Sequence, residues 1–273
     1  MARWTVRQLR AEDDAVVTKW LKRLCLGAAI LVGLSIAYVA VQDAGSIRVG
    51  YAQSPQPQHE RIRRSLEQWR GFEMAAAELD SALLLPQNLD VWFADCGQSN
   101  AFYLPAARQV VVCYELVNDL IQGFAPYLRS DSALEAAVWH TTFFVFYHEI
   151  GHALIHMLDL PTTGREEDAV DQLATLVLLN GGDVGREAAL HGASWFWLNS
   201  RGRGRRAPAW DAHALDEQRY YNIICWVYGS NPAAHRALLE SGWGLPRDRA
   251  ERCPAEFARM AKAWASVLEE HTY

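Results

Sequence analysis

The sequence lacks the excess of basic residues that marks a nucleic-acid-binding surface. It has 26 Lys and Arg residues against 32 Asp and Glu residues, which gives a formal net charge of −6. Because the first 23 residues are net basic, the rest of the chain is more acidic than this total. An acidic domain offers no electrostatic footprint for a phosphate backbone. We therefore expect no nucleic-acid partner.

Charge of either sign is missing from residues 24–41. As a helix this segment spans about 27 Å, close to the hydrocarbon thickness of a bilayer. Basic residues lie directly before it, which predicts that the amino terminus stays in the cytoplasm. We therefore expect a cytoplasmic segment at 1–23 and a transmembrane helix, or uncleaved signal anchor, at 24–41. The alternative is a cleavable signal peptide, because Tyr51-Ala52-Gln53 could end a processing site.

Cysteine is sparse, and no C-x-x-C pair occurs, so a second zinc site built from cysteines is not favoured. Of the five cysteines, Cys25 lies in the apolar segment. The other four are an even number in the part that we expect to be exported, where disulfides form. Three pairings are possible. We favour Cys96 with Cys113 across a hairpin, and Cys225 with Cys253 between two late helices.

Internal repeats are also absent, so the residues that follow the apolar segment are expected to form one domain. A Pro- and Gln-rich run leads us to interpret residues 42–58 as a linker and 59–273 as the domain. Within it, 59–83 is predicted to be helical, and 89–93 and 109–113 are predicted strands. Helices dominate the remainder. The predicted fold class is therefore α+β, mainly helical with a small β-sheet.

What the chain does contain is the motif His148-Glu149-Ile150-Gly151-His152. Residues four apart share one face of a helix, so both imidazoles can reach one metal ion while Glu149 approaches its bound water. This pattern is typical of zinc hydrolases, in which the histidines bind the metal and the glutamate is the general base. The alternative is a core helix whose histidines make ordinary hydrogen bonds.

The surrounding sequence predicts one long, buried helix over residues 132–158. Ser132 and Glu135 form a capping box at its start, and a proline beyond its end prevents continuation. Most residues around the motif are apolar. His156 lies about 12 Å along the axis from His148, too far to share a zinc ion with it. We interpret His156 as structural or as a hydrogen-bonding neighbour of the site.

A catalytic zinc site needs a third protein ligand and an open position for water. A second predicted helix, over residues 164–179, begins with several acids. Glu167 and Asp171 are four apart on one face, so Glu167 could bind zinc while Asp171 accepts the outer N–H of a ligating histidine. Glu166 and Asp168 are alternatives for the third ligand. Each acid could instead belong to a solvated first helical turn, and we favour that interpretation for Glu166.

H-E-x-x-H followed by E-x-x-x-D resembles the pattern of the gluzincin metallopeptidases. The chain more closely resembles a bacterial family of unknown function whose members are described as metallopeptidases. That resemblance covers roughly residues 60–270. It rests on Cys96-Gly97, Asn100-Ala101-Phe102-Tyr103, Cys113-Tyr114-Glu115-Leu116, the H-E-x-G-H block, Gly164-Arg165-Glu166-Glu167-Asp168, Asp216-Glu217-Gln218-Arg219 and Tyr221-Asn222. It implies a zincin-like fold with one Zn²⁺ per chain, held by His148, His152 and Glu167, and with Glu149 as the base.

The gluzincin pattern assigns no residue here to stabilise the oxyanion of the transition state. An additional hydrogen-bond donor is expected for that role. His213 and Tyr221, in the polar run 211–221, are the candidates. For His213, an equally good interpretation is that this run caps a helix that begins near Asp216.

These features predict a membrane-anchored zinc metallopeptidase. Its C-terminal domain would lie on the periplasmic or extracellular side of a bacterial cell membrane, and its substrate would be a peptide or protein. The alternative is a non-catalytic, zinc-containing protein of the cell envelope that binds peptides or serves a structural role. A zinc-free structural protein is the third hypothesis.

Overall fold

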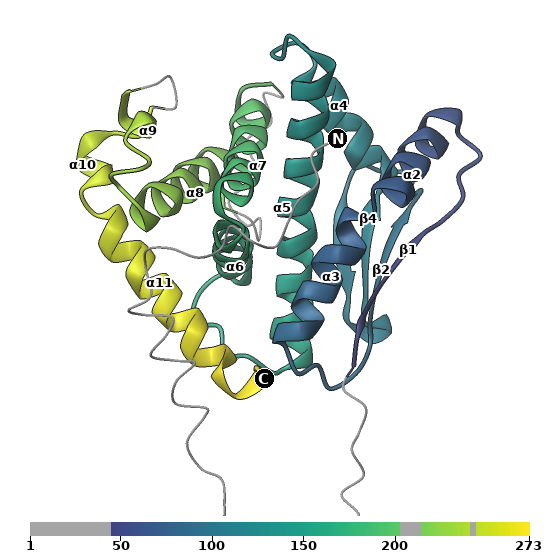
Figure 1. Cartoon of the computed structure of the whole chain (residues 1–273), viewed down its shortest axis with the longest axis horizontal. Helices are drawn as coiled ribbons and strands as arrows, with labels where there is room; N and C mark the ends of the chain where they lie inside the picture. The colour runs from purple at the N-terminus through teal and green to yellow at the C-terminus, as the bar shows by residue number, and fades with distance from the viewer. Residues whose placement is uncertain (1–44, 203–213, 241–243) are drawn as a thin grey trace, which may run out of the picture. The chain divides into compact units, whose positions relative to one another are not determined.

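The computed structural model describes residues 45–202, 214–240 and 244–273. Asp43–Tyr273 forms one compact unit (Figure 1). The predicted transmembrane segment at 24–41 and the candidate residue His213 lie outside the described residues. Among the helices that are described, none combines the length and the apolar composition needed to cross a membrane.

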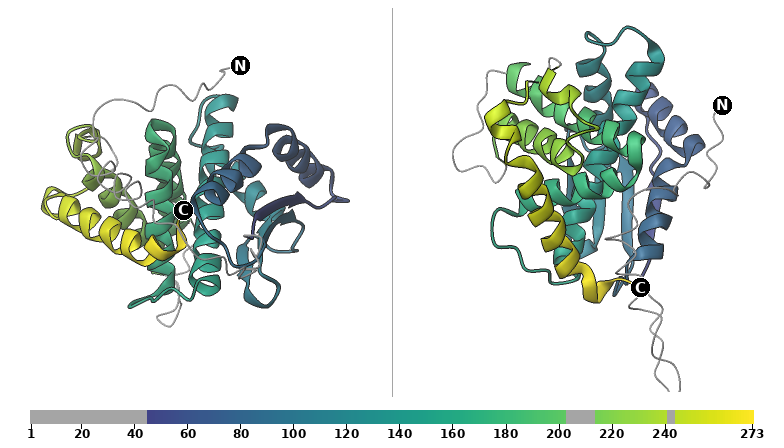
Figure 2. Two further views of the ribbon diagram at one scale, coloured as in Figure 1. Left: turned by 60° about the horizontal axis from the view of Figure 1, so that its bottom comes forward. Right: turned by 60° about the vertical axis from the view of Figure 1, so that its left-hand side comes forward.

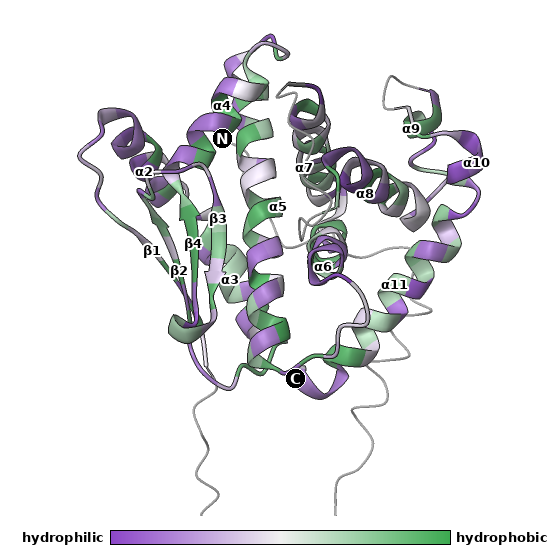
Figure 3. Cartoon of the chain, turned by 180° about the vertical axis from the view of Figure 1, so that it is seen from behind, coloured by the Kyte–Doolittle hydropathy of each residue, from purple (hydrophilic) through white to green (hydrophobic). Residues whose placement is uncertain are grey.

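A four-stranded sheet with the strand order β1-β2-β4-β3 lies at one side of this unit (Figures 1 and 3). Its parallel strands are β1 (Ile47–Tyr51), β2 (Leu89–Ala94) and β4 (Gln109–Cys113), and β3 (Ala101–Leu104) pairs antiparallel with β4. The strands predicted at 89–93 and 109–113 are confirmed. Alternate residues of β2 and β4 are fully buried, as the strand period of two requires.

Strand β1 lies inside the segment 42–58 that we predicted to be a linker, so that prediction is wrong for the described part of the segment. Ile47 is buried, and Val49 and Tyr51 pack against the core. Apolar residues at alternate positions form a strand here, directly before the Pro- and Gln-rich run. The compact unit accordingly begins well before residue 59.

Two helices, α2 (Pro57–Trp69) and α3 (Gly71–Ala82), occupy the stretch that we expected to be helical after the linker. Arg70 separates them, with a left-handed backbone φ of 56°. A residue in this conformation ends a helix, because it turns the chain away from the helix axis. Phe72 of α3 then contacts Phe93 of β2, with ring centroids 4.8 Å apart. This contact fixes α3 on the sheet.

The long helix α5 (Asp131–Met157) runs between the sheet and the other large helices (Figures 1 and 2). It confirms the predicted long helix, but the predicted capping box is wrong. Ser130 rather than Ser132 is the N-cap, and its Oγ accepts a hydrogen bond from the backbone N–H of Ala133 at 3.2 Å. Ser130 has the extended backbone that an N-cap requires, so the helix starts one residue earlier.

Helices dominate the rest of the unit, so the fold is α+β and mainly helical, as predicted. Helix α11 begins beside α8 and extends away from it on the outer side of this layer (Figure 1). The remaining elements are α4 (Tyr114–Phe124), α6 (Glu166–Asn180), α7 (Gly182–Gly202), α8 (Asp216–Ser230), α9 (Ala237–Glu240), α10 (Arg247–Ala250), α11 (Cys253–Leu268), and the 3₁₀ turns Pro105–Ala107 and Glu269–His271.

Two disulfides join the four described cysteines in the predicted pairs. Cys225 and Cys253 connect α8 with the start of α11, as expected for two late helices. The antiparallel hairpin of β3 and β4 lies between Cys96 and Cys113, so the hairpin expected there is confirmed. Cys96 follows β2, which runs parallel to β4, so this disulfide joins the carboxyl ends of two neighbouring parallel strands.

Gly151 lies where α5 and α6 approach closely. A Cβ at this position would stand 2.8 Å from Cγ1 of Val170. We predict that Gly151→Ala lowers the free energy of unfolding by about 1–3 kcal/mol, because overpacking outweighs the higher helix propensity of alanine. Gly164→Ala is the control, since a Cβ there would meet no atom within 4 Å. Urea unfolding measures both, and an unchanged midpoint for Gly151→Ala would contradict the close contact.

Candidate metal centre

Helix α5 carries the polar residues of the H-E-x-x-H motif into the interior. His148 and Glu149 are only 6% and 7% exposed, and His152 is half-buried. The two imidazole centroids lie 5.0 Å apart. One helical turn separates the two histidines, so both rings face the same neighbouring helix, α6.

The carboxylate of Glu167, in the first turn of α6, faces both imidazoles. Its Oε2 lies 3.2 Å from Nε2 of His148 and 3.6 Å from Nε2 of His152. In a tetrahedral site with zinc–nitrogen bonds of about 2.0–2.1 Å, neighbouring donor atoms are about 3.3–3.4 Å apart. The two spacings therefore fit the edges of a zinc coordination tetrahedron. The donor atoms of these three residues all lie within 4.8 Å of one another, so the group could hold a metal ion.

The outer ring nitrogens of both histidines contact carboxylates. Nδ1 of His148 lies 2.8 Å from Oδ1 of Asp171, and Nδ1 of His152 lies 2.6 Å from Oε1 of Glu166. In a neutral imidazole, a proton donated by Nδ1 leaves Nε2 with a free lone pair. The two carboxylates thus favour the tautomer that directs both Nε2 lone pairs toward Glu167, which is the tautomer that a metal ligand needs.

Arg219 of α8 holds Asp171 in place. Its Nε donates to Oδ2 at 2.7 Å and its Nη2 donates to Oδ1 at 2.7 Å, while its guanidinium stacks 3.8 Å from the ring centroid of Phe196. Both partners are buried, with Arg219 9% and Asp171 2% exposed. Burial alone would raise the pKa of Asp171, but the guanidinium outweighs burial and holds this pKa below its usual range. Asp171 is therefore an ionised acceptor for His148.

Burial opposes a positive charge on both imidazoles, but their carboxylate partners outweigh it. The nearby carboxylates of Asp171 and Glu167 raise the pKa of His148 above its ordinary value. The nearby carboxylates of Glu167 and Glu166 raise the pKa of His152 to about 9. Both shifts have the same origin, an excess of negative charge in a poorly solvated place, and this excess favours a bound cation.

Glu166 differs from our expectation of a solvated first-turn residue. Its side chain is 46% exposed, yet its carboxylate lies against the outer nitrogen of His152, as Asp171 lies against His148. Asp168, the other alternative ligand, is half-buried, and burial and the nearby Asp171 raise its pKa. Of the three acids considered as third ligand, Glu167 is the one that faces both Nε2 atoms.

Arg219 is the functional residue that the sequence analysis missed. It lies 48 residues beyond its partner Asp171, and no local spacing links the two. One signal was available, because Arg219 begins a largely apolar helix segment and a buried arginine requires a partner. That signal indicates a buried ion pair without identifying the acid.

Of the two candidate oxyanion donors, Tyr221 alone lies among the described residues. His213 lies outside the described residues. Tyr221 is half-buried on α8, with its ring 6.2 Å from that of Trp197. Residues two apart on a helix differ by about 200° around its axis, so Tyr221 points away from the face on which Arg219 contacts Asp171. The geometry therefore does not favour Tyr221 as an oxyanion donor.

Strand β3 lies at the edge of the described sheet and packs beside α5. Tyr103 of β3 and His156 of α5 are joined by a hydrogen bond of 2.9 Å between the phenol oxygen and Nδ1. His156 thus acts as a structural contact, one of the two interpretations that its distance from His148 allowed. The contact holds an edge strand beside the helix that carries the motif.

A comparison with known protein families identifies the family to which the chain belongs. The sequence model of a family described as "Putative metallopeptidase" matches residues 51–268. Because the match covers most of the chain, the chain belongs to this family, and the resemblance found in the sequence is confirmed. The matched region contains α5, α6 and α8, and with them every residue of the centre described above. Searches among curated proteins and among solved structures found no match.

We predict that Arg219→Met lowers the free energy of unfolding by about 3–5 kcal/mol, because it leaves Asp171 buried without its counter-charge. Arg201→Met is the matched control. Arg201 also stacks on an aromatic ring, 4.1 Å from the centroid of Trp197, but it is exposed, so a change below about 0.5 kcal/mol is expected. Denaturant titration distinguishes the two. Equal unfolding midpoints for the two variants would show that the buried pair contributes nothing.

Proposed function

We propose that the chain is a zinc-dependent peptidase in which His148, His152 and Glu167 hold one Zn²⁺ and Glu149 is the general base. The observation that carries this proposal is the convergence of two imidazole Nε2 atoms and one carboxylate oxygen, while separate carboxylates hold both outer nitrogens. An ordinary core helix needs no such arrangement. Membership of a metallopeptidase family supports the same conclusion.

When bound, zinc supplies an acidified water and polarises the carbonyl that is attacked. The protein supplies the proton transfers and the orientation. Glu149 is buried one residue after His148, and its carboxylate oxygen takes a proton from the attacking water and later delivers it to the leaving amine. Asp171 and Glu166 accept the outer N–H of the two imidazoles, so Nε2 is the atom of each ring that would bind zinc, and they fix the directions of the rings.

The substrate class is a peptide or protein segment in extended conformation. Within the described residues β3 ends the sheet order, so one side of its backbone is available for pairing. An extended peptide can add to such an edge through main-chain hydrogen bonds. The contact between Tyr103 and His156 holds this edge beside α5. For the oxyanion we retain His213 as the proposed hydrogen-bond donor.

The alternative function is a non-catalytic one, in which the same residues hold zinc to bind peptides or to stabilise the domain. The buried Glu149 favours catalysis over this alternative. A structural zinc site requires four protein ligands, whereas the group described here offers three donors and leaves a position for water.

A set of glutamate variants separates the roles of base and ligand. Glu149→Gln should lower kcat by about 10²–10⁴ while one zinc per chain is retained, because only the proton transfer is lost. Glu167→Gln should lose most of the zinc, and Glu166→Gln should weaken zinc binding by about 10–100-fold. Competition with a chromogenic chelator measures zinc content and affinity. Hydrolysis of a peptide library measures activity.

Two controls accompany this set. Glu67→Gln changes an exposed glutamate of α2 that pairs with Arg63 in a salt bridge, so activity and zinc content should not change. Asp168→Asn tests the alternative ligand. If Asp168→Asn lost zinc and Glu167→Gln kept it, the proposed ligand set would be wrong. Turnover by Glu149→Gln equal to that of the parent would reject the catalytic role.

We propose in addition that residues 24–41 anchor the protein in a bacterial cell membrane as a single span, with the C-terminal domain on the periplasmic or extracellular side. The two disulfides support export, because such bonds persist in oxidising compartments. In spheroplasts we expect added protease to digest the domain, and carbonate washing to leave the protein in the membrane fraction. A domain protected from protease until the spheroplasts are lysed would contradict this orientation.

A further inference from the structure

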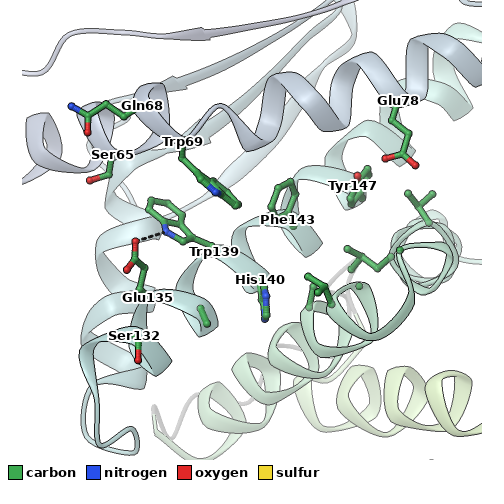
Figure 4. A pocket seen from close by; sticks show the side chains of 17 residues that line it. Ser65, Gln68, Trp69, Glu78, Ser132, Glu135, Trp139, His140, Phe143 and Tyr147 are labelled. Carbon is green, nitrogen blue, oxygen red and sulfur yellow. Dashed lines mark hydrogen bonds between the residues drawn. The ribbon is translucent and has the colours of Figure 1, made fainter. Parts of the chain in front are cut away.

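A cavity of about 700 Å³ lies beside the amino-terminal half of α5 (Figure 4). Residues of α2 and α3 line one side of it, and residues at the junction of α6 and α7 line the other. This volume falls within the range of pockets that bind small molecules. Neither the motif nor the family description assigns it a role.

The cavity is separate from the metal centre. Among the described residues that line it are Phe143 and Tyr147 of α5, but neither the motif residues nor Glu167. At 100° per residue, Phe143 lies about 140° and Tyr147 about 100° around the helix axis from His148. The lining residues also extend toward the amino end of α5, away from the motif. One helix therefore presents the metal site and this cavity on different sides.

Four aromatic rings form a continuous wall of the cavity. Trp69 stacks on Trp139 with centroids 5.7 Å apart and an interplanar angle of 23°, and Phe143 meets Trp69 edge-on at 5.4 Å. Phe143 also stacks on Tyr147, at 6.2 Å and 22°. Trp69 is 42% exposed, although a tryptophan in a monomeric domain is usually covered. A partly exposed tryptophan that lines a cavity is suited to contact a ligand.

The charged side chains around this wall are acidic. Figure 4 shows Glu135 beside Trp139 at one end, joined to its indole by a hydrogen bond, and Glu78 near Tyr147 at the other end. No lysine or arginine is found among the described residues that line the cavity. His140 also lines it, but burial and the neighbouring His191 lower the pKa of His140 to about 4, so this ring is neutral near pH 7. The lining is therefore aromatic and negative.

We propose that this cavity is a binding site for an organic cation with an apolar body. The faces of tryptophan, tyrosine and phenylalanine rings attract a cation, and they pack against an apolar group attached to it. The carboxylates of Glu78 and Glu135 add attraction from both ends of the wall. An anionic ligand would meet two acids without a basic partner among the described lining residues, and a neutral ligand would lack the charge attraction to them. This site does not depend on the proposed zinc chemistry.

The test compares three ligands that share a benzyl group and differ in charge: benzyltrimethylammonium, benzyl alcohol and phenylmethanesulfonate. Titration of the full chain is followed by isothermal calorimetry and by tryptophan fluorescence, because two tryptophans line the cavity. We expect one benzyltrimethylammonium ion to bind per chain, with an affinity about tenfold or more above that of the alcohol, and the sulfonate to bind weakest. The double variant Glu78→Gln with Glu135→Gln should reduce affinity for the cation about three- to tenfold.

The matched control is the double variant Glu67→Gln with Glu251→Gln, which removes the same charge from two exposed positions outside the cavity. This control variant should bind the cation as the parent does. An equal loss of affinity in both double variants would show that the effect comes from the overall charge of the protein rather than from the cavity. Because Glu78 and Glu135 are exposed, both double variants should keep the fold. Equal affinity for alcohol and ammonium ion would overturn the proposal in favour of a merely apolar cavity. Absence of saturable binding would overturn it outright.

Discussion

The buried contact between Arg219 and Asp171 is the interaction on which the candidate metal centre depends. It joins α8 to α6, and Asp171 extends the connection to His148 on α5. Charged hydrogen bonds in a poorly solvated place thereby fix the positions of α5, α6 and α8 relative to one another. In such surroundings each partner is costly to bury alone, so the three helices reach a favourable arrangement only together. The direction of the His148 ring follows from this arrangement.

Local periodicity allowed much of the centre to be predicted from the sequence. The spacing of His148 and His152 requires a common helix face, and the spacing of Glu167 and Asp171 requires another. The structure brings these two faces together, with Glu167 facing both imidazoles and Asp171 contacting His148. The alternating pattern also sufficed for the two strands at 89–93 and 109–113. The even number of cysteines predicted two disulfides but left three possible pairings, of which the structure has the favoured one.

Features that depend on how helices cross could not be predicted in this way. Glu166 shares a helical turn with Glu167, and only the packing of α6 on α5 decides that its carboxylate reaches His152. Arg219 belongs to a distant segment, so its pairing is a tertiary event. The strand at Ile47–Tyr51 was overlooked because a Pro- and Gln-rich neighbour suggested a linker. A five-residue alternating segment is too short to outweigh such a neighbour without knowledge of its partner, β2.

The acids of the centre are concentrated at the beginning of α6, where Glu166, Glu167 and Asp168 occupy one turn. Neighbouring carboxylates repel one another, and the partial positive charge at the amino end of a helix offsets only part of this repulsion. A divalent cation shared with the imidazoles of α5 would offset the rest and would close the short chain segment between the two helices, as a crosslink does. A cation held beside the first turn of α6 would therefore stabilise this turn as well as the approach of the two helices.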